Sequence, residues 1–235
     1  MHILTVGLTD RVTGGIESYI MAMVRTVSTD YVFDHVVVGH KCNRQDEIAS
    51  HGGKVFYTAE KHNLIKNVLD WTRILKEGKG RIDAVYFNLF SLSWITPIIL
   101  ARRYGYPVVV HAHNNNLHKC SSLVKIMHSI NRKLQRNWKI CRLTNSELSS
   151  VFMFGNAECA KTIYNAIDTE RFSFNASKRE DLRKELSIED KNVYGFSGRL
   201  SFQKNPLFLA FALLGRQLAV RHTKRFAAAC IPMKN

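Results

Sequence analysis

The sequence is short of acidic residues, proline and paired cysteines. With four prolines and 13 glycines in 235 residues, it is neither fibrous nor of low complexity, and 46% hydrophobic residues are enough for a core. Five cysteines, an odd number without a C-x-x-C pair, indicate reduced thiols and not a disulfide framework. The sequence also begins on a strand-like segment, without the basic and apolar leader of a secreted protein. We therefore expect a globular, cytoplasmic protein.

Long hydrophobic runs are also scarce, and one candidate membrane span needs to be weighed. Residues 84–101 contain no charged side chain, and this stretch is close to the length of a membrane span. The stretch nevertheless includes Asn88, Thr96 and Pro97, and its first part has the pattern of a strand. Its composition therefore predicts a strand, a loop and a buried helix in place of a membrane span.

The shortage of acidic residues leaves the chain strongly basic. It has 34 Lys and Arg against 19 Asp and Glu, a net charge of +15, and eight basic but no acidic residues follow Asp190. Such a bias favours an anionic partner: a phosphorylated ligand, an acidic membrane surface or a nucleic acid. Neither a recognition module nor interleaved aromatic and basic residues is visible, so we expect no specific nucleic-acid binding.

Short apolar segments alternate with segments of helical period over the first 165 residues. The first pair is the clearest, because residues 3–6 read as a strand and the apolar residues from Ile16 to Val27 fall on one helical face. Further strands are predicted at 36–38, 54–57, 84–87, 108–110, 140–143 and 162–164. The alternation predicts an α/β fold, a Rossmann-like doubly wound parallel sheet, with ligands at the carboxyl ends of its strands.

The composition changes after this alternation, and we predict a domain boundary there. Residues 1–174 are expected to form the Rossmann-like domain, and 175–190, which are charged and poor in large apolar side chains, a linker with room for one solvated helix. A new strand is expected at 192–196, so residues 191–210 read as the start of a second domain. Residues 211–235 are expected to be an atypical basic tail, and the second domain is predicted to be truncated.

Two segments near predicted strand ends carry residues that could bind ligands. Gly14 and Gly15 precede a helix whose free N–H groups favour an anion, although a tight turn explains them equally well. The spacing fits neither G-x-G-x-x-G nor a P-loop, which argues against both. His111 and His113 follow an apolar strand, and could begin a metal site, for which His118 is a generic third ligand, or cap a strand end at the surface.

A third segment, SGRLSFQKNP at 197–206, carries two cations at the start of a helix. Arg199 and Lys204 would neutralise a diphosphate leaving group if both faced one cleft. A solvated surface is the simpler explanation of two such residues in a basic chain.

Taken together, the order of these segments resembles the GT-B glycosyltransferases of family 4. The resemblance covers about residues 1–209. It is carried by GGIES at 14–18, VVVHAHN at 108–114, TNSE at 144–147, YNAIDTERF at 164–172 and SGRLSFQKNP at 197–206. Five motifs in the family's order, on a matching alternation of strands and helices, are more specific than any of them alone.

The resemblance implies two Rossmann-like domains that face a cleft, the acceptor on the first and the nucleotide sugar on the second. It implies a retaining hexosyl transfer from a UDP-sugar to a glycan or lipid-linked acceptor in surface polysaccharide biosynthesis, at the inner face of the plasma membrane, without a metal or other cofactor. His111 would hydrogen-bond near the transferred sugar as the catalytic residue. The donor diphosphate would lie among Gly14, Gly15, Arg199 and Lys204. The acceptor side of the cleft would include Glu17, His113, Asn114 and Asn165.

The sequence departs from the family in two places. Ala166 stands where the family commonly has glycine, which would penalise a backbone of positive φ. No glutamate follows Glu189, whereas the family's second domain grips the donor sugar with a glutamate-containing segment. A chain without that segment loses differential binding of the transition state, so we expect little transferase activity from it and suspect a frameshift.

Two alternatives remain open at this point. The first is a non-catalytic acceptor- or membrane-binding module of a split glycosyltransferase. Its basic tail, with apolar residues between the basic ones, would dock on an acidic membrane or on a separate donor-binding subunit, although an unselected tail is the simpler explanation. The second is a metal-dependent hydrolase built on His111 and His113.

Overall fold

The computed structural model of the chain describes residues 1–9, 14–27, 29–117, 120–194, 196, 200 and 204–219. It divides into two compact units, Met1–Ile167 and a second that begins at Asp168. All the strands of the described residues belong to the first unit.

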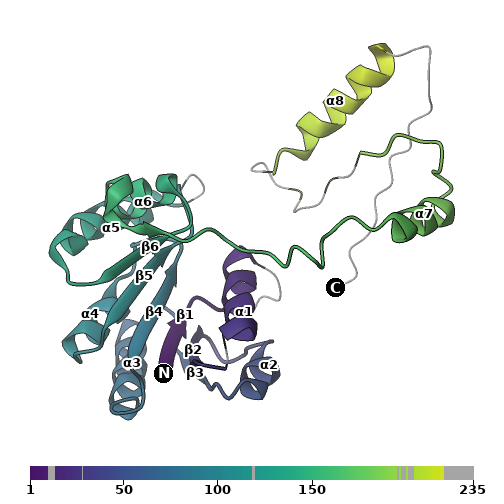
Figure 1. The fold of residues 1–235 in the computed structure, drawn as a ribbon. Helices are drawn as coiled ribbons and strands as arrows, with labels where there is room; N and C mark the ends of the chain where they lie inside the picture. The colour runs from purple at the N-terminus through teal and green to yellow at the C-terminus, as the bar shows by residue number, and fades with distance from the viewer. Residues whose placement is uncertain are drawn as a thin grey trace. The chain divides into compact units, whose positions relative to one another are not determined.

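The first unit is built on one sheet of seven parallel strands (Figure 1). The order across the sheet is β3-β2-β1-β4-β5-β6-β7, so the chain starts in the middle and winds toward both edges. The strands are β1 (His2–Val6), β2 (Val32–Val38), β3 (Val55–Thr58), β4 (Ala84–Leu89), β5 (Val108–Ala112), β6 (Cys141–Thr144) and β7 (Lys161–Thr162). This arrangement confirms the predicted Rossmann-like doubly wound fold.

Helices cover both faces of the sheet, as the winding in two directions requires (Figure 1). On one face, α1 (Gly15–Val27) and α2 (Gln45–Ser50) pack on alternate residues of β2 such as Phe33 and Val37. On the other face, α3 (Leu64–Glu77), α4 (Thr96–Arg103) and α6 (Glu147–Phe154) pack on residues such as Val85 and Val110. The remaining helix of this unit, α5 (Ser122–Leu134), contributes no residue to either apolar cluster of the described chain.

Local sequence explains where several of these elements begin and end. The side chains of Asn63 and Ser146 accept hydrogen bonds from backbone N–H groups in the first turns of α3 and α6. Gly155 ends α6 in the left-handed region, at φ 97°. The charge-free stretch 84–101 contains β4, a loop and the first residues of α4, as its composition predicts.

The second unit contains two described helices and has little buried surface. Its first helix, α7 (Ala176–Glu185), has no buried residue, as expected for a solvated helix, and α8 spans Pro206–Ala219. The predicted strand at 192–196 is wrong for the described residues 192–194 and 196, which form no strand. A lone extended segment finds no neighbour to complete its hydrogen-bond ladder. Leu207, Phe208 and Phe211 of α8 are about 70% exposed.

None of the described helices is both long enough and apolar enough to cross a membrane.

Candidate functional site

The candidate site lies where the strand order reverses, between β1 and β4. Ligands of open α/β sheets bind at this point, beyond the carboxyl ends of the strands. Gly7 follows β1 with φ 135°, and a Cβ atom there would lie 2.8 Å from the Cβ of Asn88 and 2.9 Å from its carbonyl oxygen. Only glycine fits this close approach of the loop after β1 to β4.

Five side chains gather at this point, and we call them the switch-point cluster: Tyr19, Tyr86, Asn88, His111 and His113. A hydrogen-bonded chain runs through three of them. The hydroxyls of Tyr19 and Tyr86 lie 3.0 Å apart, and the Tyr86 hydroxyl lies 2.6 Å from Nδ1 of His111. The ring of Tyr19 also stands edge-on to that of His111, at 5.1 Å between centroids. Through Tyr19, helix α1 therefore contacts side chains of both β4 and β5.

His113 belongs to the same cluster through a different partner. Its Nε2 donates to Oδ1 of Asn88 at 2.9 Å, and the amide of Asn88 donates to the carbonyl oxygen of Val6 at 3.3 Å. The rings of His111 and His113 lie 4.1 Å apart. The loop after β5 is therefore tied to β4 and to the end of β1.

Burial keeps both histidines of the cluster neutral. Desolvation lowers the pKa of His111 to about 3, and the neighbouring His113 contributes to this lowering, while the Thr144 backbone opposes it. Desolvation also lowers the pKa of His113 to about 4. Burial and the hydrogen bond with Tyr19 raise the pKa of Tyr86. At neutral pH the cluster is thus an uncharged network of donors and acceptors, not a source of positive charge.

His111 is fully buried, so the interpretation of this residue as a surface cap of a strand is wrong. Its Nε2 atom has no hydrogen-bond partner of ordinary geometry among the described residues. His113, by contrast, is only partly buried. Of the two imidazoles, His113 is the one with surface available to a ligand.

Helix α1 begins at the glycine pair, as predicted, with an acidic side chain in front of it. The Glu17 carboxylate accepts a hydrogen bond from the Thr9 hydroxyl at 2.7 Å. It lies so close to Gly14 that a Cβ atom there would be 2.0 Å from it. A diphosphate at this helix N-terminus would have to displace the carboxylate, because the two anions repel each other.

The other predicted site residues are spread over both units. Asn114 donates to the carbonyl oxygen of Phe90 at 3.4 Å and so belongs to the loop beside the switch-point cluster. Asn165 is exposed in the segment after β7, and Lys204 is exposed in the second unit. Arg199 lies outside the described residues.

A metal site is not formed by the described histidines. No group of three or more His, Cys, Asp or Glu side chains in the described part of the chain is arranged to hold a metal ion. The third ligand weighed for a hydrolase, His118, lies outside the described residues.

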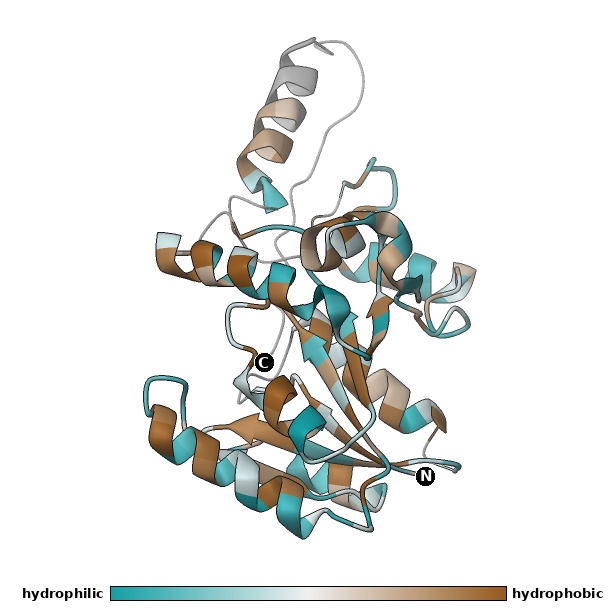
Figure 2. Ribbon diagram, turned by 90° about the vertical axis from the view of Figure 1, so that its left-hand side faces the viewer, coloured by the Kyte–Doolittle hydropathy of each residue, from teal (hydrophilic) through white to brown (hydrophobic). Residues whose placement is uncertain are grey.

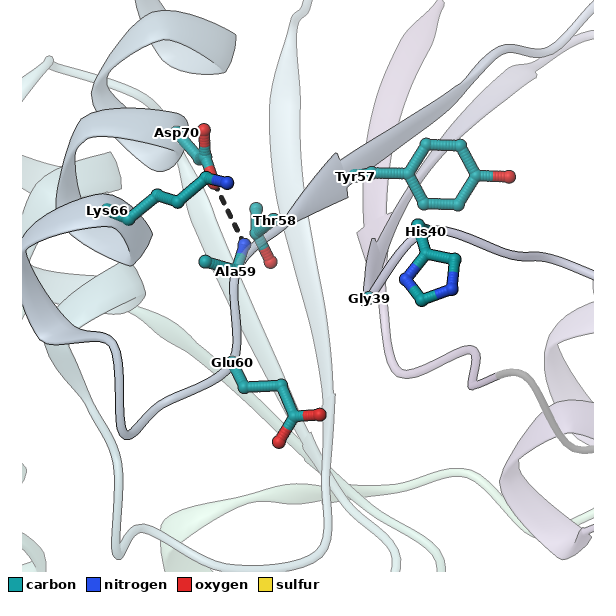
Figure 3. Close-up of a pocket in the computed structure, with 8 residues that line it drawn as sticks. All are labelled: Gly39, His40, Tyr57, Thr58, Ala59, Glu60, Lys66 and Asp70. Carbon is teal, nitrogen blue, oxygen red and sulfur yellow. Dashed lines mark hydrogen bonds between the residues drawn. The ribbon is translucent and has the colours of Figure 1, made fainter.

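A separate open cavity of about 340 Å³ lies at the carboxyl ends of β2 and β3 (Figure 3). Lys66 and Asp70 of α3 line one side of it, and His40 and Tyr57 line the other. The Asp70 carboxylate accepts a hydrogen bond from the N–H of Ala59 at 2.8 Å, which fixes the loop after β3. None of these residues could be singled out from the sequence, because isolated polar side chains at strand ends form no motif.

The hydroxyl of Tyr86 should contribute to stability through the switch-point cluster. We expect Tyr86→Phe to lower the free energy of unfolding by about 1–3 kcal/mol, because it leaves the buried Nδ1 of His111 without a partner. Tyr57→Phe is the matched control, since the Tyr57 hydroxyl bonds Gln45 at an exposed position and its loss should cost little. Urea unfolding of both variants measures the difference. If Tyr86→Phe loses no more unfolding free energy than Tyr57→Phe does, the hydrogen bonds of the switch-point cluster do not stabilise the fold.

Sequence motifs identify two members of the cluster and miss three. Tyr86 and Asn88 lie two residues apart on β4, and His111 pairs with Asn88 across the parallel ladder. Since alternate residues of a strand share a face, strand alternation was the available signal for Tyr86 and Asn88. Tyr19 carries no comparable signal, because it occupies an apolar position of an amphipathic helix.

Two solved structures share this fold over most of the chain. The crystal structure of HepE from Anabaena in complex with UDP and glucose has a TM-score of 0.70 at 18% identity, covering 92% of this chain and 58% of HepE. A glycosyltransferase from Rickettsia africae has a TM-score of 0.69 at 13% identity, covering 92% of this chain and 57% of that structure. The chain therefore has the fold of these proteins and spans less than three fifths of their length.

Comparison with models of protein families found no match, and neither did comparison with curated protein sequences.

Proposed function

We propose that the chain is part of a glycosyltransferase that transfers a sugar from a UDP-sugar to a glycan or lipid-linked acceptor. The observation that supports this most is the fold, shared over 92% of the chain with HepE, whose structure holds UDP and glucose. The order of the five motifs supports the finer proposal, a retaining family 4 enzyme of surface polysaccharide biosynthesis. Its first domain would be residues 1–174, followed by the linker 175–190, the start of the donor domain at 191–210 and the tail 211–235.

We assign the donor diphosphate to Arg199 and Lys204. Two cations suit a leaving group whose negative charge grows as the glycosidic bond breaks, and an arginine can hold a phosphate with two hydrogen bonds. Gly14 and Gly15 would approach the same phosphates with backbone N–H groups. Glu17 would then turn toward the acceptor, leaving the helix N-terminus to the donor.

The switch-point cluster would form the wall of the cleft on the acceptor side. In this proposal His113 contacts the sugars, with Asn114 and Asn165 as further polar contacts. His111 is buried and neutral, so it would act beside the transferred sugar by holding Tyr86 and Tyr19 in place. The cavity at the ends of β2 and β3, with its carboxylates, lysine and tyrosine, supplies groups that can bind acceptor hydroxyls.

UDP binding tests the donor part of this proposal. In a titration followed by the ³¹P resonances of UDP, we expect a dissociation constant on the order of 1 mM or tighter. The double variant R199Q/K204Q should bind at least about tenfold more weakly, because each charge-assisted hydrogen bond is worth about 1.5–3 kcal/mol. Glu17→Gln should bind about as well as the unchanged chain or better, since it removes the carboxylate next to Gly14.

The matched control is K178Q/R179Q, which removes the same charges from the exposed helix α7. It should weaken UDP binding by no more than about twofold, because the two charges removed are solvent-exposed and their effect on UDP is screened by salt. If K178Q/R179Q weakens binding as much as R199Q/K204Q does, the attraction is unspecific and the assignment of the diphosphate is wrong.

A further inference from the structure

Asn88 is a buried polar residue near the end of a hydrophobic strand. Hydrophobic residues make up most of the central strands of the sheet (Figure 2), and Asn88 on β4 is only 3% exposed. A buried amide costs free energy unless its hydrogen-bonding groups have partners. The amide N–H of Asn88 donates to the carbonyl oxygen of Val6, and its Oδ1 accepts from His113. Both ends of this side chain therefore have a partner, one in β1 and one after β5.

The carbonyl oxygen of Val6 determines which way round the amide of Asn88 is turned. A backbone carbonyl can only accept a hydrogen bond, so the group that lies 3.3 Å from it has to be the amide nitrogen and not the amide oxygen. Oδ1 is thereby directed to Nε2 of His113, at 2.9 Å. Because an amide oxygen is only an acceptor, Nε2 has to carry the proton. A neutral imidazole has a single N–H, so Nδ1 of His113 is left as an acceptor.

The imidazole of His113 is neutral and lies between two other rings. Burial lowers its pKa to about 4, so it carries one proton at neutral pH. The titratable rings that face it in the described structure are Tyr19 from α1 and His111 from β5, at 5.0 Å and 4.1 Å between centroids. Nδ1 makes no hydrogen bond within the described part of the chain and is not among its buried atoms without a partner. Nδ1 is therefore the atom of this ring that can meet a ligand.

We propose that Asn88 is a positioning residue that holds His113 in the Nε2–H form, so that Nδ1 accepts a hydrogen bond from a hydroxyl group of an uncharged ligand. A phosphate or carboxylate has no hydrogen to donate at neutral pH, so Nδ1 disfavours it. The form of the imidazole follows from the contacts of Asn88 alone. The nature of the ligand, a sugar, rests on the proposed function.

Imidazole ¹⁵N NMR of the free chain measures the position of the proton, because the shifts of the two nitrogens depend on which of them is protonated. H113Q identifies the resonances of His113. The Nε2–H form should exceed the Nδ1–H form at least about tenfold, because the second form would place two acceptors against each other. Asn88→Ala removes the acceptor and should lower this ratio at least about threefold.

Asn67→Ala is the matched control, since it removes the amide of another buried asparagine. Asn67 is 2% exposed and donates to the carbonyl oxygen of Ala59. Both variants lose a buried hydrogen bond and hence stability, but only Asn88→Ala should change the resonances of His113. A ratio of the two forms that Asn88→Ala leaves unchanged, or that Asn67→Ala lowers equally, would show that Asn88 does not position the imidazole.

Asn88→Asp tests the same contact with almost no change of size. A carboxylate at this position favours the imidazolium, so the pKa of His113 should rise by at least about 1 from its value in the unchanged chain. Titration of the His113 resonances measures this change. A pKa that does not rise would mean that residue 88 does not contact Nε2.

Two probes test the ligand, UDP-glucose and inorganic phosphate. UDP-glucose should move the Nδ1 resonance of His113 in the unchanged chain, and inorganic phosphate should move it only in Asn88→Asp, where the imidazolium can donate. The proposal is overturned by a protonated Nδ1 in the free chain, or by phosphate that moves the Nδ1 resonance of the unchanged chain more than UDP-glucose does. Failure of UDP to bind would instead contradict the proposed function, because the form of His113 is read from the free chain.

Discussion

The free energy of unfolding should fall by about 3 kcal/mol as the pH is lowered from 6 to 5. Three of the buried histidines account for most of this loss, and His128, whose pKa burial also lowers, adds to it. Desolvation lowers the pKa of His35 to about 4, of His111 to about 3 and of His113 to about 4. In the unfolded chain each has a pKa near 6.5, so below that pH the unfolded state binds about one more proton per histidine. The contribution of these histidines to the free energy of unfolding is therefore fully present above pH 6.5 and is lost progressively as the pH falls to about 4.

Urea unfolding at pH 7.0, 6.0 and 5.0 measures this dependence. His35→Leu is the informative variant, because both ring nitrogens of His35 are buried without a hydrogen-bond partner in the described part of the chain. The substitution should raise stability at pH 5 and remove about a third of the slope, since it removes one of three titrating groups. Unfolding free energies that agree at pH 7 and pH 5 would contradict the burial of His35, His111 and His113 as neutral side chains.

Gly7→Ala should lower the free energy of unfolding by about 4 kcal/mol. The backbone of Gly7 has φ 135°, which an L side chain rarely adopts, and the new Cβ would collide with both the Cβ and the carbonyl oxygen of Asn88. Asn88 cannot yield without moving β4 and the hydrogen bond to His113. The variant should therefore disturb the switch-point cluster as well as reduce stability.

Gly39→Ala is the control for the backbone contribution. Gly39 has φ 105°, but a Cβ there would meet no described atom within 4 Å. We expect Gly39→Ala to cost only the conformational strain, about 1–2 kcal/mol. Urea unfolding of the two variants isolates the collision with Asn88 as the difference. If both lose the same amount, the loop after β1 does not press on β4 and the geometry assigned to the switch point is wrong.

The sheet could be predicted from the sequence because its strands are short apolar runs separated by turns. All seven strands appear within a few residues of their predicted positions, including β5, whose continuous Val108–Val110 run is typical of a strand covered on both faces. Local sequence was not enough to predict correctly whether residues 192–196 form a strand. Its apolar residues fit a strand, but strand formation also needs a neighbouring strand, which local sequence does not reveal.

Side-chain networks and helix orientation were harder to predict. The pairing of His111 with Tyr86 depends on which face of β4 is turned toward α1, and the motif around His111 contains no information on that. Helix α5 is not among the elements predicted from hydrophobic periodicity. Its periodicity would in any case have placed the apolar face inside, whereas His128, Asn131 and Gln135 bury the polar face by satisfying the backbone of Leu92 and the side chain of Arg142.

A crystal structure of the chain with UDP would test the proposed transferase most directly. We predict the diphosphate at about 3 Å from the guanidinium of Arg199 and the ammonium of Lys204, with the turn at Gly14 and Gly15 facing it. A UDP molecule bound elsewhere, with Arg199 and Lys204 directed to solvent away from that turn, would contradict the account.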